Sequence, residues 1–287
     1  MKESLVNRVR ARAAYELLDL IERASLPLDR KHARRSLISH DVPRLRYRRG
    51  GKLSYGDWCW LIGILQAEMH RISEPGGAPF IVDVGCGTGI GAIAARSVIG
   101  DVGSYLGLDV RAEDVEFCID HYPYPNMVFK ELKQRNDMYR PDGEPLVPWP
   151  VGNSCADLVT AVSVWTHLSE ADARFALAEA ARVLRMGGRL LMTAFVKDES
   201  GERSGGSAAQ SRYHATAPTR WNFDRPLGGG WYTTDWADPP EAAIAISHKS
   251  LENALSSCGL ELERTVPGTW SETPGLFFQD LLVAKRL

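Results

Sequence analysis

Continuous apolar runs alternate with helical stripes along the middle of the chain. Short apolar runs at 81–84 and 105–109 each contain or end on an aspartate, and a third run covers 156–164. Further apolar strands are predicted at 189–195 and 277–285. Buried parallel strands carry such runs, and strands that alternate with helices build an α/β sheet. The pattern therefore predicts a mostly parallel sheet with helices on both faces.

The sequence also marks helix boundaries. The glycine-rich turn after the first strand leads into a predicted helix over 90–98. A capping box at 169–172 starts another helix, which is expected to last to about Arg185 and to end at the glycine pair that follows. One more helix is predicted near 249–257. These helices are the connections that a parallel sheet requires.

An N-terminal extension, residues 1–52, precedes the predicted α/β domain, which covers 53–287. Within the extension, apolar residues at helical spacing predict an amphipathic helix over 4–23. Another amphipathic helix is predicted near 57–72. Because such extensions cover the carboxyl edge of an open α/β sheet, we expect a helical cap over the substrate site. The stripe of the first helix consists of Leu5, Val9, Ala13, Leu17, Leu20 and Ile21.

Charge is distributed unevenly. The formal net charge is −2, yet the segment 30–52 holds nine arginine and lysine residues against the single acid Asp41. Such a segment either attracts a phosphate, a carboxylate or an anionic lipid surface, or forms a solvated basic face. The rest of the chain is acidic and shows no RNA-binding module, so no nucleic acid is expected as a partner.

Composition predicts a soluble, cytoplasmic enzyme. The 287 residues, 44% of them hydrophobic, are enough for a full core. No apolar run reaches the roughly 18 residues that cross a bilayer, so any membrane contact is expected to be peripheral. The charged N-terminus lacks the apolar stretch of a signal peptide. Five scattered cysteines without metal spacing predict free thiols and no metal site.

The segment 81–91 carries the strongest functional signal. Its apolar strand turns through three alternating glycines into a helix whose N-terminal amides face the turn. Dinucleotide-binding proteins use G-x-G-x-x-G/A, which 87–92 matches. Proteins that bind S-adenosylmethionine use an acidic residue before G-x-G-x-G, which Asp83 provides. A carboxylate at this strand end suits the ammonium group of S-adenosylmethionine.

A second strand end supports an adenosine ligand. Asp109 closes a short apolar strand about 20 residues beyond the glycine turn, where an acid accepts both ribose hydroxyls of an adenosine. Dehydrogenases and methyltransferases share this device, so Asp109 does not choose between them. A helix cap is the alternative role of Asp109.

A third group of motifs carries a resemblance to a known family. The motifs are Ala156-Asp157, Ser163-Val164-Trp165-Thr166-His167-Leu168 and Arg182-Val183-Leu184-Arg185-Met186-Gly187-Gly188. They resemble the F-D-x-V, S-V-F-T-H-L and R-V-L-x-P-G-G motifs of class I S-adenosylmethionine-dependent methyltransferases, most closely a bacterial small-molecule branch. Met186 stands in place of the proline of that pattern. The resemblance spans about 50–287 and includes the loops at 136–143 and 267–271.

The resemblance implies a Rossmann-like fold and a cofactor. The expected sheet has seven strands, of which the last is antiparallel and forms a hairpin between about 260–263 and 277–285. S-adenosylmethionine is implied as the cofactor. Relatives place an acid for the adenine amino group where Lys133 stands here, so Asn136 or Asp137 is expected to substitute. The predicted cofactor site comprises Asp83, Gly85, Cys86, Gly87, Thr88, Gly89, Asp109, Val110, Asn136, Asp137 and Ser163.

His167 is the candidate catalytic base. It follows the fourth strand, where the resemblance places the methyl group of the cofactor. A neutral histidine suits the proton of an alcohol or phenol, so the expected reaction is O-methylation of a small or amphiphilic metabolite, such as a sugar, glycolipid or polyketide-type hydroxyl. The alternative is that His167 only fixes its loop. His214 and His248 are weaker candidates.

An insertion over about 197–245, rich in glycine and aromatic residues, interrupts the alternation. Its aromatic residues either form a wall of the acceptor pocket or make a satellite core. Three other functions stay open: N-methylation of a small amine, S-adenosylmethionine binding without turnover, and an NAD-dependent dehydrogenase. The last agrees least, because the segment 163–168 has no role in it.

Overall fold

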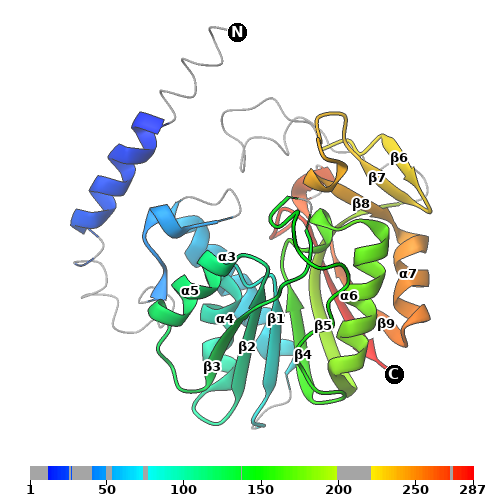
Figure 1. Cartoon of the computed structure of the whole chain (residues 1–287), viewed down its shortest axis with the longest axis horizontal. Coiled ribbons are helices and arrows are strands. Elements are labelled where there is room, and N and C mark those ends of the chain that lie inside the picture. The colour runs from blue at the N-terminus through cyan, green and yellow to red at the C-terminus, as the bar shows by residue number, and fades with distance from the viewer. Residues whose placement is uncertain are drawn as a thin grey trace, which may run out of the picture.

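A twisted sheet occupies the centre of the structure, and helices lie on both of its faces (Figure 1). The computed structural model describes residues 12–25, 27, 41–49, 54–73, 77–136, 138–198, 221–271 and 274–287. The central strands are β1 (Phe80–Val84), β2 (Ser104–Asp109), β3 (Met127–Glu131), β4 (Ala156–Ala161), β5 (Leu184–Lys197), β9 (Leu260–Val266) and β10 (Asp280–Arg286).

These seven strands follow the order β3-β2-β1-β4-β5-β10-β9. The pairs from β3 to β5 are parallel, whereas β10 is antiparallel to both of its neighbours. In the register of β10, Asp280 lies opposite Ala194 of β5, and Leu282 lies opposite Thr265 of β9. The predicted mostly parallel sheet with an antiparallel last strand is therefore confirmed.

Three further strands extend the sheet: β6 (Arg225–Gly228), β7 (Trp231–Thr233) and β8 (Ile244–Ser247). β8 pairs in parallel with the last three residues of β5, and β7 lies antiparallel between β6 and β8. All three belong to the predicted insertion, of which residues 199–220 lie outside the described part. Because β5 is 14 residues long, it pairs with the central strands as far as Ala194, and its last three residues pair with β8 of the insertion.

Aromatic residues of the insertion form part of a satellite core. Trp221 and Phe223 pack on Phe195 of β5, with ring centroids 5.1 and 4.8 Å away. Trp270 and Phe278 complete the cluster from the loop before β10. Of the two roles considered for the aromatic insertion, these residues take the structural one.

Helices cover the two faces of the sheet in separate groups (Figure 1). α3 (Tyr55–Ile72), α4 (Ile90–Ile99) and α5 (Ala112–His121) share one core, while α6 (Glu170–Val183) and α7 (His248–Ser257) share the other. Successive residues of a strand point to opposite faces, so Ile81 joins the first core and Val82 joins the second. Burial of strands on both faces explains their continuous apolar runs.

Helix α6 ends earlier than predicted. Its start is as expected, since Ser169 caps the first turn by accepting a backbone amide hydrogen bond. The helix stops at Val183 instead of about Arg185, and β5 begins at Leu184. The Leu184 carbonyl accepts a hydrogen bond from the guanidinium of Arg286 in β10. Leu184 also pairs with Ala156 of β4, so this segment belongs to the sheet and the glycine pair lies inside a strand.

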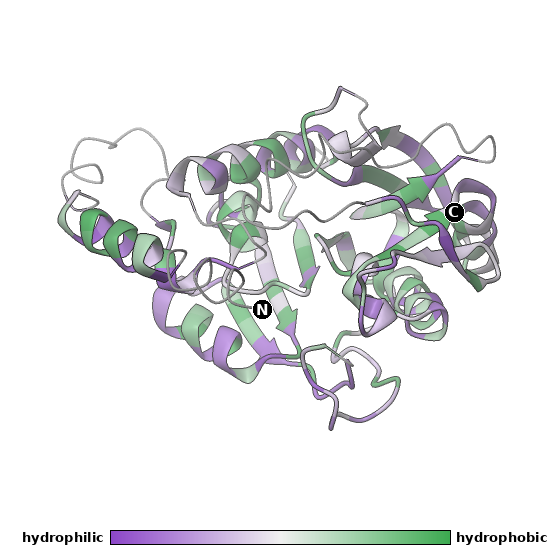
Figure 2. Cartoon of the chain, turned by 90° about the horizontal axis from the view of Figure 1, so that it is seen from above, coloured by the Kyte–Doolittle hydropathy of each residue, from purple (hydrophilic) through white to green (hydrophobic). Residues whose placement is uncertain are grey.

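Two helices of the N-terminal half agree with the prediction. Residues 12–25 are helical and overlap the helix predicted over 4–23, whose residues 4–11 lie outside the described part. This helix lies at one side of the molecule (Figures 1 and 2). α3 matches the helix predicted near 57–72 and starts at a cap in which Ser54 accepts a hydrogen bond from the Asp57 amide. In the described part, no helix is long and apolar enough to span a membrane.

The end of the extension, residues 41–49, packs against α4 and α5. The carbonyl of Tyr47 accepts a hydrogen bond of 2.6 Å from Thr88 Oγ1 in the glycine turn. The Tyr47 ring stacks on Phe117 of α5, with centroids 4.4 Å apart. The extension therefore reaches the turn that was predicted to hold the cofactor.

Candidate functional site

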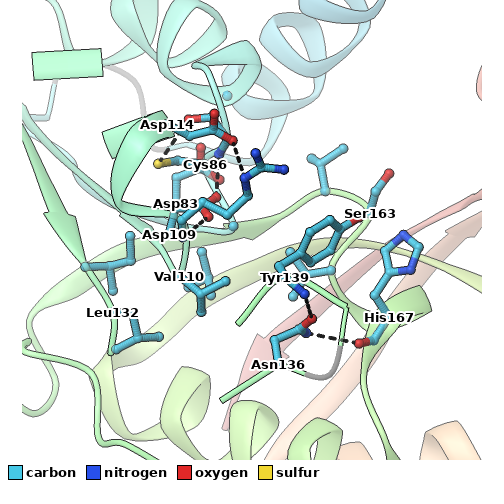
Figure 3. A pocket seen from close by; sticks show the side chains of 18 of the residues that line it. Asp83, Cys86, Asp109, Val110, Asp114, Leu132, Asn136, Tyr139, Ser163 and His167 are labelled. Atoms are coloured by element: carbon cyan, nitrogen blue, oxygen red, sulfur yellow. Dashed lines mark hydrogen bonds and ion pairs between the residues drawn. The ribbon is translucent and has the colours of Figure 1, made fainter. Parts of the chain in front are cut away.

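A cavity of about 260 Å³ lies at the carboxyl ends of the central strands (Figure 3). Open α/β sheets bind their ligands at this edge. Gly89 belongs to the turn but does not line the cavity, and Asp137 lies outside the described residues. The other predicted site residues all line it: Asp83, Gly85, Cys86, Gly87, Thr88, Asp109, Val110, Asn136, Ser163 and His167.

Two glycines of the turn are required by close packing. Gly89 has a φ of +99°, and a Cβ there would lie 2.4 Å from the ring of Tyr122. A Cβ on Gly91 would lie 2.2 Å from Asp83 Oδ2. Only glycine therefore lets the first turn of α4 approach both side chains. The result is a helix N-terminus placed directly beside a buried carboxylate.

Asp83 lies at the end of β1 and is 2% exposed. Its carboxylate accepts hydrogen bonds from Tyr105 Oη at 2.6 Å and from Thr160 Oγ1 at 2.7 Å. Burial raises the pKa of Asp83 to about 6, although both hydrogen bonds favour the charged form. A cation in the cavity would compensate for this lost hydration.

Asp109 ends β2 on the same wall. Its two carboxylate oxygens accept the backbone amides of Gly87 at 2.7 Å and Arg111 at 2.9 Å. Burial raises the pKa of Asp109, and these two hydrogen bonds oppose the rise. A carboxylate has about four lone-pair positions, so each oxygen keeps room for one more donor. The geometry suits a pair of adjacent hydroxyl groups.

The loop after β3 contributes a residue that the sequence analysis missed. Gln134 is 7% exposed and lines the cavity, and its Oε1 is buried without a hydrogen-bond partner among the described residues. Val110 and Leu132 form apolar walls of the same cavity. Lys133, at the position aligned with the acid of relatives, is exposed. The alternation of Leu132 and Gln134 was the signal that placed residue 134, and not 133, inside.

Asn136 organises its own loop. Its Oδ1 accepts the backbone amides of Met138 at 3.1 Å and Tyr139 at 3.0 Å, which is an Asx turn. Its Nδ2 donates to the His167 carbonyl at 3.3 Å. The side chain thus joins the loop after β3 to the segment after β4 (Figure 3). Its assignment to the cofactor stays a prediction.

His167 lies in the 3₁₀ turn Trp165–His167 and lines the opposite side of the cavity from Asp109 (Figure 3). Its Nδ1 is 2.9 Å from the carbonyl oxygen of Glu241. A carbonyl oxygen only accepts, so Nδ1 carries the proton and Nε2 of the neutral ring carries the lone pair. Burial lowers the pKa of His167, while the Glu241 hydrogen bond opposes the shift. The ring is therefore a neutral base at pH 7.

The other candidate histidines differ from His167. His248 starts α7, is exposed on its side chain and lies 3.5 Å from Glu252. It does not line the cavity. His214 lies outside the described residues. His167 is thus the histidine of the described part that borders the cavity.

Ser163 lies between β4 and His167 in a left-handed conformation, with a φ of +60°. Its amide donates to Thr193 Oγ1 at 2.8 Å, and its Oγ donates to Gln279 Oε1 at 3.1 Å. Gln279 in turn is 3.4 Å from Thr166 Oγ1. This network holds the segment after β4 against β5 and the loop before β10. Non-glycine residues in this conformation are often found at functional sites.

Cys86 adds a neutral wall beneath the turn. Its thiol interacts with that of Cys118 on α5, and this contact, followed by burial, raises the pKa of Cys86 well above its usual range. Both cysteines are buried free thiols, as predicted. Because this thiol is protonated, the negative charge of the wall comes from Asp83 and Asp109.

The basic extension reaches the cavity through Arg49. This side chain lines the cavity and forms an ion pair of 3.0 Å with Asp114 on α5, a carboxylate that is 2% exposed. Arg111 lies 3.3 Å from the same carboxylate. Of the two roles considered for the basic segment, neither included this one, in which a residue of the segment pairs with a buried acid at the cavity wall.

Residues 82–192 match the family model described as a methyltransferase domain. The matched stretch runs from β1 into β5. It contains the glycine turn, Asp109, Gln134 and His167. Of the motifs that carried the resemblance in sequence, the segment 163–168 borders the cavity through Ser163, Val164, His167 and Leu168, whereas 156–157 and 182–188 do not line it.

Solved structures share the fold. An S-adenosylmethionine-dependent methyltransferase from Mesorhizobium loti has 18% identity and a TM-score of 0.51, covering 79% of this chain and 100% of that chain. A geranyl diphosphate C-methyltransferase from Streptomyces coelicolor A3(2), in complex with Mg²⁺, geranyl diphosphate and S-adenosyl-L-homocysteine, has 14% identity and a TM-score of 0.52, covering 78% and 80%. The [4+2]-cyclase SpnF has 17% identity and a TM-score of 0.51, covering 84% and 85%.

The family model matches 82–192 as a methyltransferase domain, which indicates S-adenosylmethionine as the cofactor. At these identities the solved structures show the fold alone. Because a C-methyltransferase and a cyclase are both among them, the fold does not define the acceptor.

Proposed function

We propose that this chain is an S-adenosylmethionine-dependent methyltransferase that methylates a hydroxyl oxygen of a small or amphiphilic metabolite. The observation that carries the choice of oxygen is the state of His167. Its Nδ1 proton is held by the Glu241 carbonyl, and burial lowers its pKa, so Nε2 is a free base near neutral pH. An alcohol or phenol needs such a base, whereas a neutral amine does not.

The cavity wall fits the three parts of the cofactor. Asp83 offers a negative charge to the ammonium group, and Asp109 offers acceptors to the ribose hydroxyls. Gln134 offers its unpartnered Oε1 to the adenine amino group, between the apolar walls of Val110 and Leu132. A buried acceptor without a partner is unfavourable by about 1–3 kcal/mol, and a donor from the ligand would remove that penalty.

The protein's part in the reaction is positioning and proton removal. Bound S-adenosylmethionine supplies a methyl group made electrophilic by its sulfonium. His167 Nε2 takes the hydroxyl proton of the acceptor as the oxygen attacks, and the Glu241 carbonyl holds the imidazolium in place through Nδ1. The low pKa of His167 then favours return of the proton to solvent. Holding both reactants in line contributes to the rate without a further catalytic group.

The test starts from a screen of hydroxylated metabolites with methyl-labelled S-adenosylmethionine. With an acceptor in hand, His167→Ala should lower kcat by about 10²- to 10⁴-fold, the usual contribution of a general base. Its affinity for S-adenosylmethionine should stay nearly unchanged. His248→Ala is the matched control, because that histidine is exposed and outside the cavity, and it should keep full activity.

Three outcomes would contradict the proposal. A drop of only a few-fold in the His167 variant would make this histidine structural. Mass spectrometry that places the methyl group on nitrogen, carbon, protein or RNA would exclude O-methylation. Failure of the wild-type chain to bind S-adenosylmethionine at all would exclude the class.

A further inference from the structure

The helix at residues 12–25 exposes its apolar side. Leu17, Leu18, Leu20 and Ile21 have exposed fractions of 58, 53, 64 and 52%. An α-helix turns by about 100° per residue, so these four side chains share one arc of its surface. The exposed alanines on the same arc are Ala13, Ala14 and Ala24.

The polar side of this helix faces the protein. Both carboxylate oxygens of Glu22 accept hydrogen bonds of 2.7 Å from Arg48, which is 3% exposed. Asp19, on the same side, is 5% exposed. A helix that packs on its own domain normally buries its apolar stripe. Here the orientation is reversed, which leaves an apolar arc for a partner.

The charge of the extension indicates which partner. Residues 1–52 contain 14 arginine and lysine residues and 6 aspartate and glutamate residues, a formal charge of +8 in a chain of net −2. Among the described residues, Arg12, Arg23, Arg44 and Arg46 are exposed. An apolar arc combined with surrounding positive charge is the pattern of a helix that lies in a membrane interface. A bilayer of anionic lipids offers an apolar interior to the arc and negative head groups to the arginines.

We propose that the helix at 12–25 docks on the surface of an anionic phospholipid bilayer. The apolar arc enters the boundary between head groups and acyl chains, and the arginines contact the head groups. A second copy of the chain fits less well. A stable dimer buries roughly 800 Å² per partner, whereas a helix of this length presents an arc of roughly 20 by 10 Å.

The docking helix is connected to the cavity through two consecutive residues. Arg48 holds Glu22 of the helix, and Arg49 lines the cavity, paired with Asp114. Docking would therefore bring the cavity close to the bilayer surface. Together with the proposed function, this favours an amphiphilic acceptor taken from the membrane. The docking itself does not depend on methyl transfer.

The experiment is a flotation assay with the full chain and two kinds of vesicle. One kind is pure phosphatidylcholine, and the other contains about 30% phosphatidylglycerol, which gives its surface a negative charge. The wild-type chain should float with the anionic vesicles only. Leu17→Glu/Ile21→Glu should reduce the bound fraction by at least about tenfold, because each buried leucine-sized side chain accounts for about one order of magnitude in partition.

The matched control is Val102→Glu/Met186→Glu. These exposed apolar residues lie at the opposite, amino-terminal edge of the sheet, and the change in charge is the same. The control should float like the wild type, and circular dichroism should show all variants folded. Equal binding of the Leu17/Ile21 variant, or no binding of the wild type to anionic vesicles, would overturn the proposal. So would light scattering that shows a dimer lost in that variant, since the occupant would then be a second copy.

Discussion

At the scale of single residues, Asp83 links cofactor binding to pH. Its pKa is raised to about 6 by burial, above the roughly 3.9 of an unfolded aspartate. The protonated form therefore stabilises the fold below about pH 4, and this contribution is lost as pH rises through about 6. A bound ammonium group favours the carboxylate instead.

We therefore predict that the Kd for S-adenosylmethionine falls roughly tenfold between pH 5 and pH 7, with release of a proton on binding. Titration calorimetry in buffers of different ionisation enthalpy measures both quantities. Asp83→Asn should remove the pH dependence, and Asp101→Asn, at an exposed position, should preserve it. If the Kd of the wild type is constant over this pH range, the ammonium group of S-adenosylmethionine does not bind at Asp83.

Gln134 provides a second test at this scale. Gln134→Leu keeps the volume of the side chain but removes its acceptor, so the affinity for S-adenosylhomocysteine should fall about five- to tenfold, the value of one neutral hydrogen bond. The wild type should prefer S-adenosylhomocysteine over an analogue without the adenine amino group, and the variant should bind the two equally. Gln66→Leu on α3, outside the cavity lining, is the control. Unchanged discrimination in the Gln134 variant would place the adenine elsewhere.

At the scale of elements, Asp280 joins β10 to its surroundings. Its side chain is fully buried, and it accepts hydrogen bonds of 2.8 Å from the amides of Val196 and Gly268 and from Trp270 Nε1. These donors belong to β5 and to the loop that closes the satellite core. One carboxylate thus holds the antiparallel strand, the long strand and the loop at 267–271 together.

We expect Asp280→Ala to reduce the free energy of unfolding by about 2–4 kcal/mol, because it leaves buried N–H groups without an acceptor. Urea denaturation followed by fluorescence measures this change. Asp235→Ala, at an exposed position, should change the unfolding free energy by less than about 0.5 kcal/mol. A similar small change for Asp280→Ala would show that its three donors find other partners.

At this scale, some elements could be predicted from the sequence and others could not. The central strands were predictable because burial on both faces demands continuous apolar residues, as in 81–84. The start of β5 directly after α6 was not, since Leu184 pairs with Ala156 of β4, a contact between distant segments. The strands β6 to β8 were missed for a related reason. Their pairing partner is the end of β5, which local composition does not reveal.

At the scale of the whole molecule, ligand binding should stabilise the fold. A ligand at 100 times its Kd adds about 2.7 kcal/mol to the unfolding free energy. For a chain of this size we expect S-adenosylmethionine and S-adenosylhomocysteine to raise Tm by about 5 °C or more. NAD should leave Tm unchanged, since the family model indicates the other cofactor. A larger shift with NAD in differential scanning fluorimetry would contradict that cofactor.

The site was predictable to the extent that it follows strand ends. Asp83, Asp109 and His167 lie on the cavity wall because parallel strands bring their carboxyl ends to one edge. Gln134 was missed although its alternation with Leu132 indicates an inward side chain. Arg49 was missed because its place at the cavity depends on its pairing with Asp114, a residue far away in the sequence.

The contact between His167 Nδ1 and the Glu241 carbonyl has a consequence for how this chain can change over evolutionary time. The acceptor is a main-chain atom, so any residue at position 241 that keeps the same backbone path preserves the tautomer of the histidine. Substitution of the side chain at position 241 therefore does not change the protonation of His167. A change in the length of the segment that leads to it is not, because it moves the carbonyl. Insertions and deletions near 241, and not substitutions at 241, would therefore alter or abolish the ability of His167 to act as a base.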